Sequence, residues 1–116
     1  MWIASLTGFY SVTAAPRGRT QIRARARRDL VRLKALGGIR ARIIHTPAAD
    51  YAWRMIVMPK TWVRAATLLA GSANSYTNFK KAVGSVDAPR AATYARAWEA
   101  FTGIEQEEGR RWPTAR

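Results

Sequence analysis

The first third of the chain has the hydrophobic and polar pattern of paired strands. Residues 2–13 are rich in aromatic and aliphatic side chains with Ser and Thr between them, which predicts a strand. The sequence Ala-Pro-Arg-Gly at 15–18 predicts the turn that follows. Residues 20–27 then alternate Arg with Ala and Ile, which is the period of a strand with one exposed face.

A helix is the alternative for this segment, because apolar side chains also recur through it at helical spacing. They are Ile22, Ala26, Leu30 and Leu33. We favour a strand over 20–27 and a helix over 29–36, which Gly37 and Gly38 would end.

The middle of the chain repeats the strand signal and then changes to helical spacing. Residues 39–46 and 51–58 predict two further strands, joined by a short loop. Pro59 suits the first turn of a helix, and the apolar spacing predicts that helix over 60–71.

The last part of the chain has helical spacing until residue 104. A short helix is expected over 79–83 with Asn78 as its N-cap, and a longer one over 88–104 with Asp87 as its N-cap. Residues 105–116 lack an apolar period, and we expect them to form a flexible tail.

This order of elements, ββαββαα, predicts an α+β two-layer sandwich. It would have an antiparallel sheet of about four strands with helices on one face. The chain has 116 residues, which is the size of one domain, and we assign that domain to residues 1–104. The second face of the sheet would be open to solvent or to a partner.

The charge of the chain narrows the choice of partner. Lys and Arg number 20 against 7 Asp and Glu, for a net charge of +13. Between residues 17 and 42 a single acid, Asp29, opposes ten basic residues. Such a concentration predicts one strongly basic surface and favours a polyanion as partner, with a merely solvated basic face as the alternative.

Alternating arginines are the first candidate for a binding surface. On a strand, Arg23, Arg25 and Arg27 would lie on one face at intervals of about 6.6–7 Å. This spacing is close to the phosphate repeat of an extended single strand. Other arginines would widen the track if the strands are neighbours: Arg17, Arg19, Arg40, Arg42 and Arg54. The alternative is a solvated face or an edge strand protected by charge.

Aromatic side chains are the second candidate. Tyr10 and Tyr51 lie on predicted strands, where exposed rings beside arginine stack unpaired bases. Trp53, Trp62 and Trp98 occur instead in periodic apolar patterns, and we expect them in the core.

Two lysines beside a predicted helix start are the third candidate. Lys80 and Lys81 follow Asn78, and such a loop can hold a phosphate at a helix N-terminus. In the alternative, which we favour, Asn78 caps the helix, Phe79 fills the core and both lysines are solvated.

The residues that carry catalysis or bind metals are scarce. The chain has no cysteine and one histidine, His45, which would need an orienting partner such as Asp50 and a nucleophile. We expect a structural or surface role for His45, no metal site, no cofactor and no enzymatic activity. No apolar run approaches the ~20 residues that span a bilayer. The lack of cysteine fits a reducing compartment, so we expect a cytoplasmic protein without a membrane partner.

Four short motifs follow one another between residues 5 and 101. They are GFYSV at 8–12, the Arg-alternating strand that leads into Asp29-Leu30, Asp50-Tyr51-x-x-Arg54, and Tyr76-x-Asn78-Phe79-Lys80. This succession resembles a family of small, largely uncharacterised bacterial and phage proteins. The resemblance implies a strand over 20–27 and an α+β fold, and no activity comes with it.

These observations predict a non-enzymatic nucleic-acid-binding protein. A basic, Arg-rich sheet face would hold the phosphates of RNA or single-stranded DNA. The alternative is a phage-type protein-interaction module that inhibits or docks on a CRISPR-like host defence ribonucleoprotein. A third hypothesis is a subunit of a larger ribonucleoprotein. An uncovered sheet face also permits a dimer.

Overall fold

The strand-forming residues at the start of the chain make two strands. The computed structural model describes residues 1–111; β1 (Trp2–Ala4) and β2 (Phe9–Ala15) pair antiparallel. In the turn between them, the Ser5 N–H and hydroxyl both donate to the Gly8 carbonyl at 2.9 Å. The single strand predicted over 2–13 is therefore wrong at residues 5–8, where Ser, Thr and Gly supply a turn.

The Arg-rich segment forms a strand and then a helix, as predicted, but the change comes earlier. β3 (Arg19–Ala24) ends before Arg25, and α1 (Arg27–Gly37) begins two residues before the predicted start. Arg and Ala are good helix formers, and Asp29 in the first turn favours the helix N-terminus. Gly38 ends α1 in the left-handed conformation, with φ of 61°.

The remaining strands of the sheet are β4 (Ile44–His45) and β5 (Trp53–Val57). Only two residues of the strand predicted over 39–46 are extended and paired. The other residues form a connection without strand pairing. Its apolar side chains Ile39, Ala41 and Ile43 still pack in or against the core. α2 (Pro59–Ser72) confirms the helix predicted over 60–71, with Pro in its first turn.

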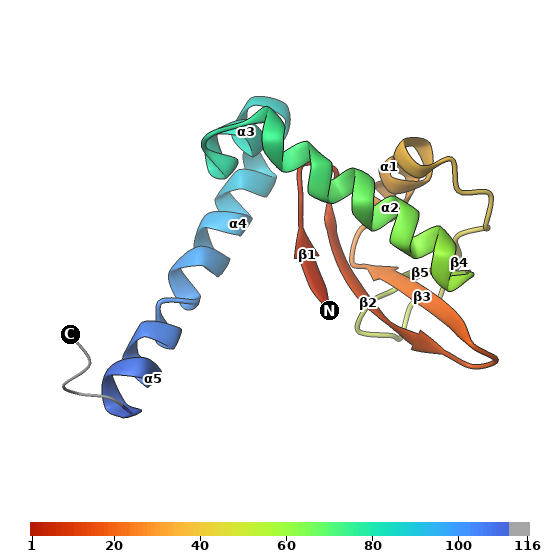
Figure 1. The fold of residues 1–116 in the computed structure, drawn as a ribbon, viewed down its shortest axis with the longest axis horizontal. Helices are drawn as coiled ribbons and strands as arrows, with labels where there is room; N and C mark the ends of the chain where they lie inside the picture. The colour runs from red at the N-terminus through yellow and green to blue at the C-terminus, as the bar shows by residue number, and fades with distance from the viewer. Residues whose placement is uncertain (112–116) are drawn as a thin grey trace. The chain divides into compact units, whose positions relative to one another are not determined.

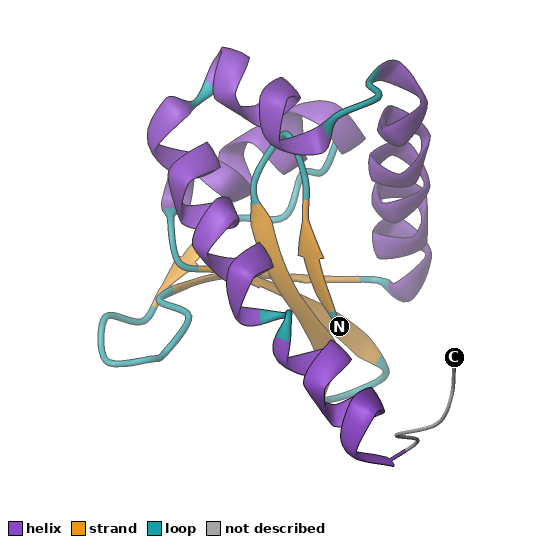
Figure 2. Cartoon of the chain, turned by 90° about the vertical axis from the view of Figure 1, so that its left-hand side faces the viewer, coloured by secondary structure: helices purple, strands orange, loops and turns teal. Residues whose placement is uncertain are grey.

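The sheet has the strand order β1-β2-β3-β5-β4, and each neighbouring pair is antiparallel (Figure 1). Figure 2 shows the strands in orange and the helices in purple. α1 and α2 pack on one face of it. The buried core joins this inner face to the two helices and includes Tyr10, Val12, Ile22, Ala24, Leu30, Leu33, Met55, Val57, Ala65 and Leu69. The α+β class is thereby confirmed, with one strand more than expected.

The chain divides into two compact units. The first, Met1–Thr77, holds the sheet, α1, α2 and the short 3₁₀ helix η1 (Ala73–Ser75). The second, Asn78–Arg116, holds α3 (Phe79–Val86), α4 (Ala88–Ala100) and α5 (Gly103–Arg111). In the described part of the chain, no helix is long and apolar enough to span a bilayer.

The second unit begins with two capped helices, as predicted. Asn78 Oδ1 accepts from the Lys81 N–H and Asp87 Oδ1 from the Arg90 N–H, each at 3.0 Å. The stacked rings of Phe79 and Tyr94, 5.6 Å apart, join α3 to α4.

Two expectations for the second unit differ from the structure. Trp98 was expected in the core but is 60% exposed. α5 is helical through residues expected to lack regular structure, because Glu, Gln and Arg favour helix even without an apolar stripe. Residues 112–116 of the expected tail lie outside the described residues.

Candidate nucleic-acid interface

One row of side chains crosses the sheet on its outer face, away from α1 and α2. The register places Trp2 of β1 opposite Ser11 of β2, Ser11 opposite Arg23 of β3, and Arg23 opposite Arg54 of β5. Directly opposite residues of antiparallel strands point to the same side. Their neighbours along the strands, such as Ile22, are buried in the core. We call Trp2, Ser11, Arg23 and Arg54 the cross-strand row.

The two arginines of this row are cross-strand neighbours of like charge. Arg23 donates from Nη2 to Ser11 Oγ at 2.9 Å, and Arg54 donates from Nη1 to Gln21 Oε1 at 3.4 Å. Both acceptors are neutral. The Nε atoms of both arginines are buried and have no hydrogen-bond partner among the residues that the structure describes.

This pairing is electrostatically costly without a ligand. Like charges placed directly opposite one another destabilise a sheet, and a buried donor without a partner loses its hydration. Native proteins satisfy most buried donors, so each exception needs an explanation. An anion bound at Arg23 and Arg54 would offset the repulsion between their charges.

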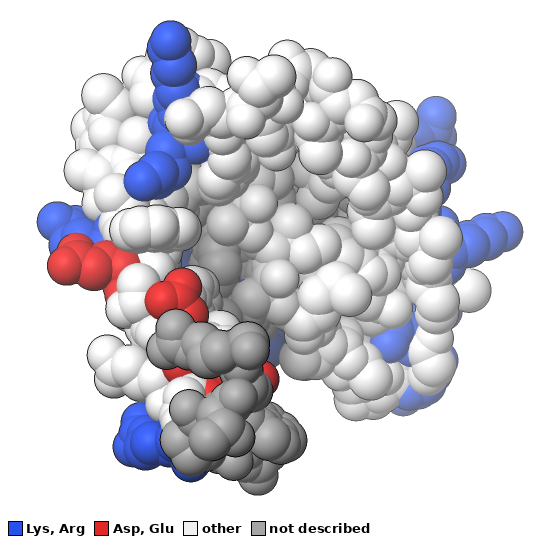
Figure 3. All heavy atoms as spheres, turned by 60° about the vertical axis from the view of Figure 1, so that its left-hand side comes forward, with Lys and Arg blue, Asp and Glu red and all other residues white. Residues whose placement is uncertain are grey.

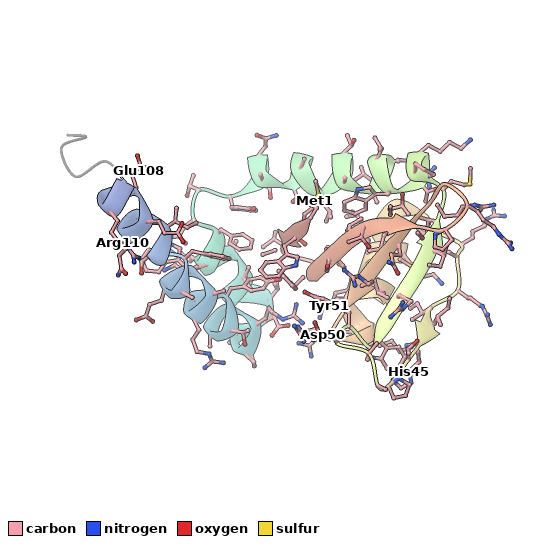
Figure 4. The ribbon with its side chains drawn as sticks, turned by 90° about the horizontal axis from the view of Figure 1, so that it is seen from below. Met1, His45, Asp50, Tyr51, Glu108 and Arg110 are labelled. Carbon is pink, nitrogen blue, oxygen red and sulfur yellow. The ribbon has the colours of Figure 1, made fainter. Side chains whose placement is uncertain are left out.

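Tyr51 holds two guanidinium groups beside the row. The guanidinium carbons of Arg23 and Arg25 lie 4.9 and 4.6 Å from the centroid of its ring, within the range of cation–π interactions. Arg25 also donates from Nη1 to Asp50 Oδ1 at 3.1 Å. Figure 4 shows Tyr51 and Asp50 close together. Asp50, Tyr51 and Arg54, which formed one short sequence motif, therefore each contact or lie opposite at least one of these two arginines.

The hairpin between β2 and β3 adds arginines at its tip. Arg17 and Gly18 in the turn both have positive φ, of 62° and 68°. Arg19 lies on the same face of β3 as Arg23, with Gln21 between them. A shallow hollow of about 450 Å³ lies at this tip, lined by Ala15, Pro16, Arg17, Arg19 and Ile56.

The predicted ladder of Arg23, Arg25 and Arg27 is wrong as a strand feature. β3 ends at Ala24, so Arg25 lies beyond the strand and Arg27 is the first residue of α1. The outer face of β3 instead presents Arg19, Gln21 and Arg23. The cationic track thus runs partly across the strands, from Arg23 to Arg54, instead of along one strand.

Tyr10 is also corrected as a candidate stacking residue. Its side chain is 0% exposed, and its hydroxyl donates to the Asp29 carbonyl at 2.8 Å. Tyr51 is only 6% exposed, and guanidinium groups lie over its ring. Neither tyrosine offers a free face to a base, so Tyr51 positions arginines and Tyr10 belongs to the core.

The other predicted residues do not belong to the cross-strand row. Arg40 and Arg42 are exposed in the connection between α1 and β4. Lys80 and Lys81 belong to α3 in the second unit, where the Lys80 amine lies 4.4 Å above the ring of Trp98. The capping role of Asn78, described above, accounts for this segment.

Sequence reasoning missed the aromatic end of the row. Trp2 is 64% exposed, and its ring lies edge-on to Phe9 at 6.0 Å. The signal was present in the Ser-Leu-Thr-Gly segment, whose small and polar residues favour a turn. A turn there makes β1 a separate edge strand and brings Trp2 opposite Ser11.

His45 has a structural contact instead of a catalytic one. Its ring stacks on Trp53 at 3.8 Å with an interplanar angle of 9°. Asp50 bonds to Arg25, and Figure 4 shows His45 pointing away from Asp50 and Tyr51. Within residues 1–111, no group of three His, Asp or Glu side chains is arranged to hold a metal ion.

The charge is concentrated in the unit that contains the sheet. Residues 1–77 contain thirteen Lys and Arg against two Asp, and so carry +11 of the net +13. Of these two acids, Asp29 is buried and Asp50 bonds to Arg25. In the view of Figure 3 the acidic side chains are few and grouped, whereas the basic ones are widely distributed.

Comparison of the chain with protein-family models, with curated proteins and with solved structures finds no match. The family resemblance thus stays a prediction.

Proposed function

We propose that this protein binds RNA or single-stranded DNA without catalysing a reaction, and that the outer face of its sheet holds the phosphates. The observation that carries the proposal is the Arg23–Arg54 pair, in which two half-buried arginines lie directly opposite one another and donate to the neutral side chains of Ser11 and Gln21. A phosphate oxygen is a strong acceptor for guanidinium groups and also neutralises the paired charges.

The arginine side chains of this face have the right geometry to bind a phosphate group. Arg presents a planar fork that bonds two oxygens at once, and Tyr51 restricts the orientation of two such forks. Arg19 and Arg17 extend the positive surface to the hairpin tip. Release of counterions from the nucleic acid would supply much of the affinity, with little sequence preference.

The proposal is tested by fluorescence anisotropy with short single- and double-stranded RNA and DNA. The double variant Arg23→Gln/Arg54→Gln removes two charges from the row. Lys60→Gln/Arg96→Gln removes two charges from exposed positions on α2 and α4 and is the matched control.

We expect the row variant to bind single strands at least about ten-fold more weakly, since a charge-assisted hydrogen bond contributes about 1.5–3 kcal/mol. The control should stay close to the wild type. Equal losses in both variants would mean that only total charge matters and would contradict a site at the row.

A protein-interaction module of phage type, docking on a host defence ribonucleoprotein, is the second candidate. One observation favours it: the outer face combines guanidinium groups with the exposed apolar side chains of Trp2 and Ile56, a combination common at protein interfaces. A folded protein that binds none of the four nucleic acids at ~150 mM salt would favour this candidate.

A further inference from the structure

We infer that Trp2 is a stacking platform for one unpaired base whose phosphate binds the Arg23–Arg54 pair. This inference rests on the proposed function and deepens it. It assigns the cross-strand row to a nucleotide unit, with an aromatic end for the base and a cationic end for the phosphate.

Trp2 is both exposed and held in place. Its side chain is 64% exposed, although a large aromatic ring gains much from burial. The strand that carries it is fixed, because the Val12 N–H donates to the Met1 carbonyl at 2.8 Å. Phe9 packs edge-on against the indole at 6.0 Å. A ring that is ordered before binding loses little conformational entropy when a base stacks on it.

The residues of the row are spaced by the strands that carry them. Neighbouring strands lie about 4.7–4.9 Å apart, so the backbones at Trp2 and Arg23 are separated by two such intervals, roughly 10 Å. Long side chains reach across this interval, so Trp2 and Arg23 can approach the two ends of one nucleotide. Ser11 lies between them with a small buried side chain whose hydroxyl bonds to Arg23. The Arg23 guanidinium therefore lies over the middle of the row, nearer to Trp2 than the spacing of the backbones.

The chemistry of the two ends of the row matches an unpaired nucleotide. A base stacked on an aromatic ring must offer a free face, which bases within a duplex do not have. Aromatic rings beside a cationic groove are the usual means of binding single strands with little sequence preference. The row thus predicts single strands as substrates and a weaker interaction with duplexes of the same length.

Abasic oligonucleotides distinguish the contribution of the bases to the affinity from that of the phosphates. The probes are fluorescein-labelled oligouridylate and oligothymidylate of about ten nucleotides, within the range that a small domain occupies. Each is compared with a strand of the same length and charge whose bases are absent. The RNA and DNA arms show which sugar the site accepts.

The wild type should bind the intact strand about five-fold to one-hundred-fold more tightly than the abasic strand. In Trp2→Ala this ratio should fall close to one, and in Trp2→Phe it should largely return. Trp98→Ala, which removes another exposed tryptophan, is the matched control and should keep the wild-type ratio. Trp2→Phe retains a ring on β1 and so tests stacking even where Trp2→Ala perturbs the edge strand.

The two levels of the proposal fail differently. A folded Trp2→Ala variant that keeps the wild-type ratio overturns the stacking inference. A folded Trp2→Phe variant that loses this ratio overturns it as well. If Arg23→Gln/Arg54→Gln still loses binding in that case, the proposed phosphate site stands. If the arginine variant binds as its control does, the proposed function itself is contradicted, whatever Trp2 does.

Discussion

Gly8 and Asp29 meet where β2 and α1 begin. A Cβ atom at residue 8 would overlap the Asp29 side chain, so only glycine leaves room for it. Asp29 Oδ2 accepts from the Phe9 N–H at 3.0 Å, and the Asp29 carbonyl accepts from the Tyr10 hydroxyl. This contact fixes α1 to the inner face of the sheet, on the strand that contributes Ser11 to the outer face.

Gly8→Ala should therefore destabilise the protein. The added methyl group forces Asp29 or the backbone to move, and overpacking of this kind costs about 1–3 kcal/mol. Gly71→Ala is the matched control, because nothing lies within 4 Å of a Cβ at that position in α2. It should raise stability by about 0.5–1 kcal/mol. Urea denaturation measures both, and a Gly8→Ala protein as stable as the wild type would refute the close contact.

Tyr10→Phe should weaken folding without affecting binding. The substitution removes a buried hydroxyl that bonds to the Asp29 carbonyl, at a cost of about 1 kcal/mol. Because Tyr10 belongs to the core, the affinity for single strands should not change. A loss of affinity at unchanged stability would place Tyr10 at the interface after all.

Substitutions of Tyr51 should show that its ring, and not its hydroxyl, supports the binding of single strands. Tyr51→Phe keeps the ring under the Arg23 and Arg25 guanidiniums, and should bind single strands as the wild type does. Tyr51→Leu removes the cation–π contacts, each of about 0.5–1 kcal/mol at such sites, and frees both arginines. Its affinity should fall several-fold in anisotropy titrations. Equal affinities for the Phe and Leu variants would mean that Tyr51 does not position the arginines.

Arg54→Gln should have opposite effects on stability and on binding. Without ligand, it relieves a like-charge pair, so stability should stay constant or rise by about 0.2–1 kcal/mol. With a short single strand present, the melting temperature of the wild type should rise through preferential binding to the folded state, and that of the variant should rise less. A variant that is markedly less stable without ligand would show that Arg54 serves the fold alone.

Features set by neighbouring residues were predicted well from the sequence. The caps Asn78 and Asp87, the start of α2 at Pro59 and the transition from strand to helix before Asp29 all depend on short-range chemistry. The fold class followed from the order of these elements.

Features set by pairing between distant strands were not predictable in the same way. The predicted ladder of Arg23, Arg25 and Arg27 does not form, because a helix that begins at Arg27 competes with the strand for the same Arg and Ala residues. The cross-strand row joins residues 2, 11, 23 and 54, and its register depends on the turns and on the core packing. Arg54 was singled out for its charge, but its position opposite Arg23 required the sheet order.

The salt dependence of single-strand binding tests the central claim most directly. For each phosphate contact, the slope of log K against log salt changes by about 0.7. Because one phosphate binds the pair, Arg23→Gln/Arg54→Gln should therefore flatten the slope of the wild type by about 0.7, while Lys60→Gln/Arg96→Gln should leave it nearly unchanged. An unchanged slope in the row variant, or equal flattening in both, would contradict a phosphate site at Arg23 and Arg54.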